Sequence, residues 1–251
     1  MEKSFIIAGF GGQGVMVMGQ LLSYTACETT DKYVTYFPSY GAEMRGGTAN
    51  CYVVISDDPV GAPKVSKADY LVVLNDPSMA KFKDAVVPGG TIFVNSSVVT
   101  LEPDRDDVHV VKVDAGTIAY ELGNPKVLNL VMSGAIIGYT EVLPAENVLQ
   151  TAFKKLGAKR PELNPLNEKA FRRGWEIGHA AKQGLVESNK KYREALLPGI
   201  FFMFYHTCKF SVNATRYSSE SGVLTAKARR SLAGFSLTSE RDRHIDGIAM
   251  R

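Results

Sequence analysis

The chain has 251 residues, 45% of them hydrophobic, and a formal net charge of +3 at pH 7. This length fits one α/β domain, or one domain with an appended segment, and the apolar fraction is enough for a substantial core. No apolar run is long enough to span a membrane, and Met1-Glu2-Lys3-Ser4 leads into a strand pattern rather than a signal peptide. We therefore expect a cytoplasmic protein without membrane segments.

Charge and periodicity divide the chain into two parts. Residues 1–187 hold 18 Lys and Arg against 21 Asp and Glu, whereas residues 188–251 hold 11 against 5. The second part shows no clear helical or strand period. We expect one α/β domain over residues 1–187 and an atypical basic extension over 188–251, for which disorder and a non-native origin both remain open. Its positive charges are scattered, so we expect no nucleic-acid partner.

The cysteines are too far apart to hold a metal. Cys27, Cys51 and Cys208 form no C-x-x-C pair. Iron–sulfur clusters and structural zinc need grouped thiolates or thiolate–imidazole sets. The sequence therefore predicts no metal site in this chain, and Cys51 is interpreted as a small buried strand residue.

The first element combines a strand, a glycine turn and a helix. Phe5–Ala8 is a short run of strand type, and the apolar-rich segment from Val15 suits a helix. A G-x-G-x-x-G pattern between them lets the backbone turn tightly and places free N–H groups at a helix start, where an anion can bind. The candidate ligand-binding residues are Gly9, Gly11, Gly12, Gln13 and Gly14. The alternative is a packed turn without a ligand.

The second strand, Tyr33–Phe37, ends without a carboxylate. A domain that binds NAD(P) should carry Asp or Glu there to hold the ribose, but Pro38-Ser39-Tyr40 follows instead. This absence weakens the alternative of an NAD(P)-binding Rossmann oxidoreductase.

A second glycine-rich motif follows, and it reads Pro-Ser-Tyr-Gly-Ala-Glu-Met-Arg-Gly-Gly-Thr-Ala-Asn-Cys over residues 38–51. Arg45 stands between glycines, and arginine suits bidentate contact with phosphate or carboxylate. The candidates for ligand binding here are Tyr40, Glu43, Arg45, Gly46, Gly47 and Asn50. The alternative is an internal Glu43–Arg45 pair that only makes the loop rigid.

Strands and helices alternate along the rest of residues 1–187. The predicted strands are Ala49–Ile55, Ala68–Asn75, Thr91–Asn95 and Val108–Val113. The predicted helices are Pro77–Val86, Thr117–Leu122, Leu128–Val142, Pro144–Leu156 and Leu166–Gln183. Asp76 or Ser78 is expected to cap the first of these helices, and Gly134 and Gly138 are expected to allow close helix packing. This alternation predicts an α/β fold with a Rossmann-like open, mostly parallel sheet and helices on both faces.

No nucleophile and base can be paired from the sequence. His109 falls in a strand and His179 on a helix, where structural or surface roles are expected. We therefore assign no catalytic residue to this chain.

The two glycine motifs and the strand that ends in Ile55-Ser56-Asp57 resemble the gamma subunit of 2-oxoacid:ferredoxin oxidoreductases, over roughly residues 1–185. The resemblance implies a complex that converts a 2-oxoacid and coenzyme A to acyl-CoA and carbon dioxide and reduces ferredoxin. The motif around Arg45 looks most like the 2-oxoglutarate members, then the branched-chain (2-oxoisovalerate) members. A non-catalytic scaffold or regulatory subunit is the further alternative.

The resemblance also implies which partners carry the cofactors. Thiamine diphosphate, Mg²⁺ and 4Fe-4S clusters are expected in alpha and beta subunits, with a ferredoxin-like delta subunit in some complexes. None of these cofactors is expected in this chain alone. Its glycine turn and Arg45 would suit the anionic diphosphate of coenzyme A, the co-substrate.

Overall fold

A computed structural model of the chain describes residues 2–40 and 48–186. The predicted boundary at residue 187 and the basic extension over 188–251 lie outside the described residues. Both therefore stay predictions.

A six-stranded sheet forms the centre of the described domain. Its order is β2-β3-β1-β4-β5-β6. The strands are β1 (Glu2–Phe10), β2 (Tyr33–Tyr40), β3 (Thr48–Ser56), β4 (Ala68–Val73), β5 (Val86–Asn95) and β6 (His109–Val113). β3 is antiparallel to both of its neighbours, and the three remaining pairs are parallel. Five strands therefore run in one direction, and the prediction of a mostly parallel sheet is confirmed.

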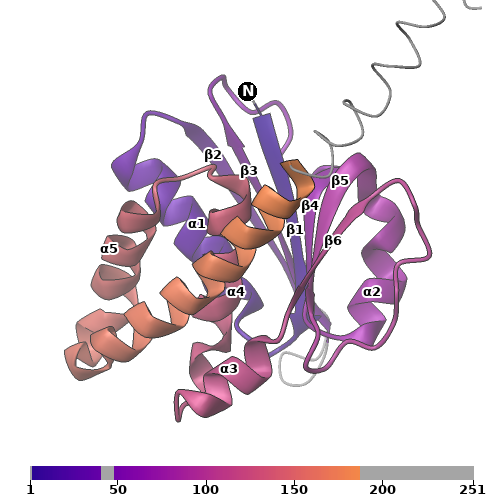
Figure 1. The fold of residues 1–251 in the computed structure, drawn as a ribbon. Coiled ribbons are helices and arrows are strands. Elements are labelled where there is room, and N and C mark those ends of the chain that lie inside the picture. Colours follow the sequence, from indigo (N-terminus) through magenta and orange to yellow (C-terminus); the bar gives the residue numbers. More distant parts are fainter. Residues whose placement is uncertain (1, 41–47, 187–251) are drawn as a thin grey trace, which may run out of the picture. The chain divides into compact units, whose positions relative to one another are not determined.

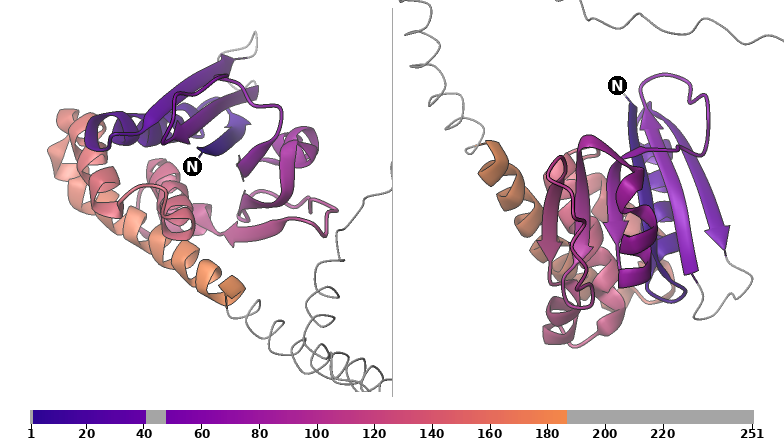
Figure 2. Two further views of the ribbon diagram at one scale, coloured as in Figure 1. Left: turned by 90° about the horizontal axis from the view of Figure 1, so that it is seen from above. Right: turned by 90° about the vertical axis from the view of Figure 1, so that its right-hand side faces the viewer.

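Helices cover both faces of this sheet, as expected. One face packs against α1 (Val15–Thr29), α3 (Ala115–Glu121), α4 (Leu128–Thr140) and α5 (Ala145–Lys155). The opposite face packs against α2 (Asp76–Phe82). Figure 1 shows this division, with α2 alone on its side of the sheet, and Figure 2 shows it from two further directions. Residues 164–186 are also helical, and short 3-10 turns occupy Lys83–Ala85, Pro125–Val127, Gly157–Lys159 and Pro161–Leu163.

Alternation along β1 explains its unbroken apolar run. Phe5 and Ile7 belong to the core on the α1 face, whereas Ile6 and Ala8 belong to the core on the α2 face. Successive strand side chains point to opposite faces, so a strand covered on both sides must be apolar throughout. Cys51 is fully buried on the α1 face, as expected, and burial raises the pKa of its thiol to about 12.

Two pairs of glycines bring α4 against the helix formed by residues 164–186. A Cβ added at Gly134 would lie 2.0 Å from the carbonyl oxygen of Phe171, and one added at Gly178 would lie 2.0 Å from that of Ala135. Gly138 and Gly174 make equally close contacts, so side chains larger than hydrogen are excluded. The expected close packing through Gly134 and Gly138 is confirmed.

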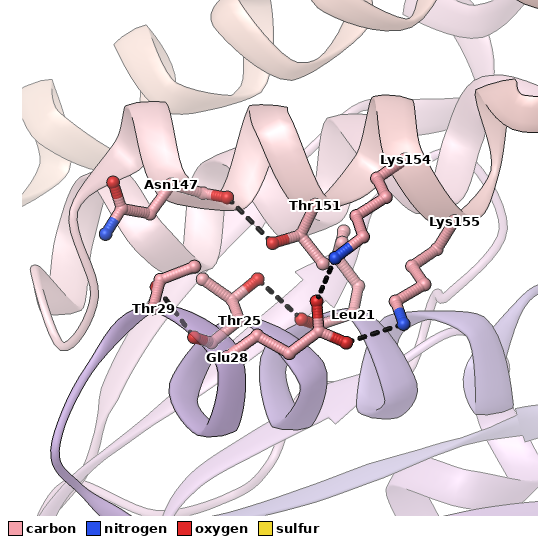
Figure 3. A network of polar contacts seen from close by, with 8 residues as sticks. All are labelled: Leu21, Thr25, Glu28, Thr29, Asn147, Thr151, Lys154 and Lys155. Carbon is pink, nitrogen blue, oxygen red and sulfur yellow. Dashed lines mark hydrogen bonds and ion pairs between the residues drawn. The ribbon is translucent and has the colours of Figure 1, made fainter.

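Charged side chains link the outer surfaces of α1 and α5. Glu28 pairs with Lys155 at 2.5 Å and with Lys154 at 2.9 Å, as Figure 3 shows. Hydrogen bonds from these two lysines hold the pKa of the Glu28 carboxyl below its ordinary value. The Lys155 ammonium also lies 4.4 Å from the centre of the Tyr24 ring. These contacts sit at the helix surface, beyond the buried core between α1 and the sheet.

Within residues 2–40 and 48–186, no helix is both long enough and apolar enough to cross a lipid bilayer.

Candidate ligand-binding edge of the sheet

The glycine turn joins the end of β1 to the start of α1, as predicted. Gly12 has φ +96°, and Gly14, the residue before the helix, has φ +86°. Both values favour glycine, because a Cβ is strained in this region. α1 has no side-chain cap and no acidic residue in its first turn. Among the described residues, no carboxylate therefore occupies its first N–H groups, which is the arrangement that favours an anion.

The glycines of the turn differ in what surrounds them. A Cβ at Gly9 would lie 2.8 Å from the Gln13 Oε1 atom, and a Cβ at Gly14 would lie 2.7 Å from the Asn129 Cβ atom. A Cβ at Gly12 would meet no heavy atom of the described residues within 4 Å. Gly9 and Gly14 thus permit close packing within the protein. Gly12 faces open space and leaves the turn accessible.

Gln13 contacts the protein through both atoms of its side-chain amide. Its Oε1 atom accepts hydrogen bonds from the Phe10 N–H group at 2.7 Å and from the Asn75 side chain at 3.2 Å. Its Nε2 atom donates to the carbonyl oxygen of Leu74 at 3.1 Å. The side chain therefore ties the turn after β1 to the end of β4. A contact between this amide and a ligand remains an untested prediction.

The second motif begins and ends at the same edge of the sheet as the glycine turn. Tyr40, the last residue of β2, pairs with Ala49, and Ala49 pairs with Gly9 on β1. Thr48, the first residue of β3, pairs with Phe10. The two strands that precede the motifs both end at this edge, but they are not neighbours, because β3 lies between them. Both motifs therefore flank one edge of the sheet, although the strands that precede them are not adjacent.

Asn50 is placed on the face of the sheet opposite α1. It is buried in β3 and pairs with Ala8 of β1 and Ser39 of β2. Cys51 and Val53 lie on the α1 face, and Tyr52 lies on the other, so alternation puts Asn50 beside Tyr52. Glu43, Arg45, Gly46 and Gly47 lie outside the described residues, and their predicted ligand contacts are untested.

Two asparagines at this edge are not singled out by the sequence patterns. Asn75 caps α2, since its Oδ1 atom accepts a hydrogen bond from the Ser78 N–H group at 2.9 Å. The sequence instead suggests Asp76 or Ser78 as the cap, which is wrong. The sequence does contain a pattern that indicates Asn75 as the cap, because Asn75 directly precedes Asp76-Pro77 and proline is favoured in the first turn of a helix. Asn129 of α4 has no comparable signal, because only the fold brings it to Gly14.

Metal chemistry is not supported by the described part of the edge. Across the residues that the structure describes, no three His, Cys, Asp or Glu side chains gather into a possible metal site. The described part of the edge offers backbone N–H groups and side-chain amides.

Known proteins match both the sequence and the fold. A sequence model of the pyruvate ferredoxin/flavodoxin oxidoreductase family matches residues 4–177. The 2-oxoglutarate synthase subunit KorC of Methanocaldococcus jannaschii is 35% identical over 179 residues, which cover 70% of this chain and 94% of that protein. The ketoisovalerate oxidoreductase subunit VorA of Methanothermobacter thermautotrophicus is also 35% identical, over 189 residues. That match covers 75% of this chain but only 34% of VorA, so this chain spans about a third of that longer relative.

Among solved structures, the gamma subunit of a keto/oxoacid ferredoxin oxidoreductase from Geobacter sulfurreducens has a TM-score of 0.64 and 27% sequence identity. The match covers 72% of this chain and 98% of that subunit.

The structure defines an open α/β domain in which a glycine turn and an uncapped helix start lie at the carboxyl edge of the sheet, an arrangement that favours an anion. The chain belongs to the pyruvate ferredoxin/flavodoxin oxidoreductase family, and its relatives include gamma-type subunits of 2-oxoacid:ferredoxin oxidoreductases. The resemblance inferred from the two glycine motifs is therefore confirmed.

Proposed function

We propose that this chain is the gamma subunit of a complex that converts a 2-oxoacid and coenzyme A to acyl-CoA and carbon dioxide, while two electrons pass to ferredoxin. The observation that carries the proposal is the family match over residues 4–177, nearly the whole described domain. In this proposal alpha and beta subunits, with a delta subunit in some complexes, complete the enzyme. They hold thiamine diphosphate with Mg²⁺ and the 4Fe-4S clusters, and thiamine diphosphate supplies the electron sink.

The contribution of this chain is to hold the diphosphate of coenzyme A. Three features support this role: the uncapped start of α1, the accessible turn at Gly12, and the return of the second motif to the same edge. Backbone N–H groups at a helix start attract phosphate oxygens, and Arg45 would add a charged, two-pronged donor. Both elements bind and orient the co-substrate without taking part in proton transfer.

The 2-oxoacid is proposed to be 2-oxoglutarate, with 2-oxoisovalerate second. The motif over residues 38–51 favours these two classes, and relatives named for each are equally similar to this chain, at 35% identity. Because the side chain of the oxoacid would be bound mainly by other subunits, kcat/KM of the reconstituted complex must decide between them. A clear preference for pyruvate over both acids would overturn the assignment.

An NAD(P)-dependent dehydrogenase is disfavoured by the sheet order. In that fold the second strand lies beside the first and brings a carboxylate to the ribose. Here the antiparallel strand β3 occupies that position, with Ala49 and Asn50 opposite Gly9 and Ala8.

Replacing Arg45 tests the role in coenzyme A binding. A charge-assisted contact with phosphate contributes about 1.5–3 kcal/mol. Arg45→Ala in the reconstituted complex should therefore raise the KM for coenzyme A roughly 10- to 150-fold. Arg45→Lys should recover only part of this loss, because the planar fork is missing. The measurement is the coenzyme A dependence of acyl-CoA formation, with the carbon dioxide burst in the absence of coenzyme A recorded in parallel.

The matched control is Arg173→Ala. Arg173 is an exposed arginine that lies far along the chain from Arg45 and pairs with Glu121. This variant should leave the KM for coenzyme A and the burst unchanged. If Arg45→Ala leaves this KM unchanged and instead prevents subunit assembly, the loop is a subunit interface and the ligand role is wrong.

A further inference from the structure

The hydrogen-bond ladder between β1 and β4 changes at its last step. The two strands are parallel, with Ala8 opposite Val73, and the Leu74 N–H group donates to the Ala8 carbonyl oxygen at 3.0 Å. In a regular parallel ladder, the next bond would run from the Phe10 N–H group to the Leu74 carbonyl oxygen.

The side-chain amide of Gln13 stands in place of that bond. The Phe10 N–H group donates to Gln13 Oε1 at 2.7 Å, and Gln13 Nε2 donates to the Leu74 carbonyl oxygen at 3.1 Å. One primary amide thus satisfies both backbone groups, in the manner of an inserted peptide unit. The ends of β1 and β4 are held apart by the width of that amide. Gly9 makes room for it, because a Cβ there would lie 2.8 Å from Oε1.

This insertion falls where the order of the sheet reverses. β1 is followed by α1 on one face, and β4 is followed by α2 on the other. In open α/β sheets, the crevice between two such strand ends is the usual place for a ligand. Asn75 extends the link, because its Nδ2 atom donates to Gln13 Oε1 and its Oδ1 atom caps α2. Gln13 therefore connects the residues that precede both helices.

The N–H groups nearest to this link remain available. No atom of the described residues accepts a hydrogen bond from the N–H group of Gly11 or Gly12. Both glycines lie between Phe10 and Gln13, the two residues joined by the 2.7 Å bond, so their orientation depends on it.

We propose that Gln13 is a positioning residue: its amide spreads the ends of β1 and β4 and fixes the turn so that the Gly11 and Gly12 N–H groups face the ligand. For the identity of that ligand, coenzyme A, the inference rests on the proposed function. The role given to Gln13 is distinct from the proposed function, because Gln13 shapes the site while the backbone contacts the ligand.

The bridge itself can be tested in the isolated full-length chain by NMR, without any ligand. Scalar coupling across the hydrogen bond should connect the Phe10 amide nitrogen to the Gln13 side-chain carbonyl carbon. Gln13→Met keeps the length of the side chain but removes the amide. In that variant the coupling should move to the Leu74 carbonyl carbon, as β1 and β4 close into a regular ladder. Coupling to Leu74 already present in the wild-type chain would overturn the proposal.

The effect on the site is measured in the reconstituted complex. Loss of the bridge should raise the KM for coenzyme A in Gln13→Met by roughly three- to tenfold, the range that corresponds to one ordinary hydrogen bond. The value of kcat at saturation should stay unchanged, which a general loss of structure would not produce. Gln13→Glu should raise the KM further, because a carboxylate at the helix start repels an anion. A KM within twofold of wild type in both variants would overturn the positioning role.

Pantetheine, the acyl acceptor without the diphosphate, separates the two hypotheses. If wild type uses pantetheine and coenzyme A with equal KM, the diphosphate role in the proposed function fails. The bridge would still be judged by the coupling measurement. If wild type discriminates strongly but Gln13→Met discriminates equally well, the proposed function stands and the inference about Gln13 is wrong.

Discussion

Gly12 and Gly14 share a left-handed backbone but differ in their surroundings. Alanine at Gly12 has only backbone strain to overcome, which costs about 1–2 kcal/mol. Alanine at Gly14 adds a contact of 2.7 Å with the Asn129 Cβ atom, and overpacking of this kind typically costs a further ~1–3 kcal/mol. We therefore expect Gly14→Ala to destabilise the chain more than Gly12→Ala. Chemical denaturation of the two variants tests this order, and equal losses would show that α4 moves away freely.

For single residues, the sequence predicts backbone conformation and burial better than it predicts side-chain partners. The glycine turn, its place between strand and helix, and the burial of Cys51 follow from residue type and spacing. The partners of Gln13 do not, because Leu74 and Asn75 are separated from it by 61 and 62 positions. A polar side chain in a glycine turn is equally compatible with a ligand and with a distant backbone, and only the register of β1 on β4 decides between them.

The pairing of α4 with the helix over residues 164–186 depends on glycines whose neighbours are backbone atoms. A Cβ at Gly174 would lie 1.9 Å from the Val131 carbonyl oxygen, and backbone cannot yield as a flexible side chain does. Gly174→Ala should lower the free energy of unfolding by at least about 1–3 kcal/mol. For a domain of this size, each kcal/mol lowers Tm by roughly 2–4 °C.

Gly184 provides the matched control in the same helix. No heavy atom of residues 2–40 and 48–186 lies within 4 Å of a Cβ built at this position, so Gly184→Ala should leave stability unchanged or raise it by up to about 1 kcal/mol through better helix propensity. Thermal unfolding of both variants separates the two effects. A similar Tm loss at Gly184 would contradict the packing argument, because helix propensity favours alanine at this position.

The sequence patterns predict the strand β3 but do not reveal its antiparallel direction. With predicted ends at Phe37 and Ala49, the connection is long enough to leave the direction of the next strand open. In the structure β2 continues through Pro38 to Tyr40, and β3 begins at Thr48. Proline is tolerated because β2 is an edge strand. The seven residues between Tyr40 and Thr48 are too few for a parallel crossover, so the strand must turn back.

For the whole chain, we expect the purified protein to be colourless and inactive without its partners. The three cysteines are widely spaced in the sequence, and the described residues contain no cluster of metal-binding side chains. The measurement is a visible spectrum after anaerobic purification, followed by a 2-oxoacid oxidation assay before and after addition of the other subunits. A brown protein, or turnover by this chain alone, would contradict the assignment of cofactors to partner subunits.

The seam between β1 and β4 also has a consequence for how the chain folds. On one side, β1, β2 and β3 are consecutive in sequence, and on the other β4, β5 and β6 are too. The pairings within each half span at most 54 positions, whereas the seam joins Phe5 to Tyr70, 65 positions apart, the longest span in the described sheet. Closing a loop of that length costs on the order of 4 kcal/mol in chain entropy. We expect the seam to form late in folding and to open early in unfolding. A ligand bound there would hold β1 and β4 together and so slow unfolding.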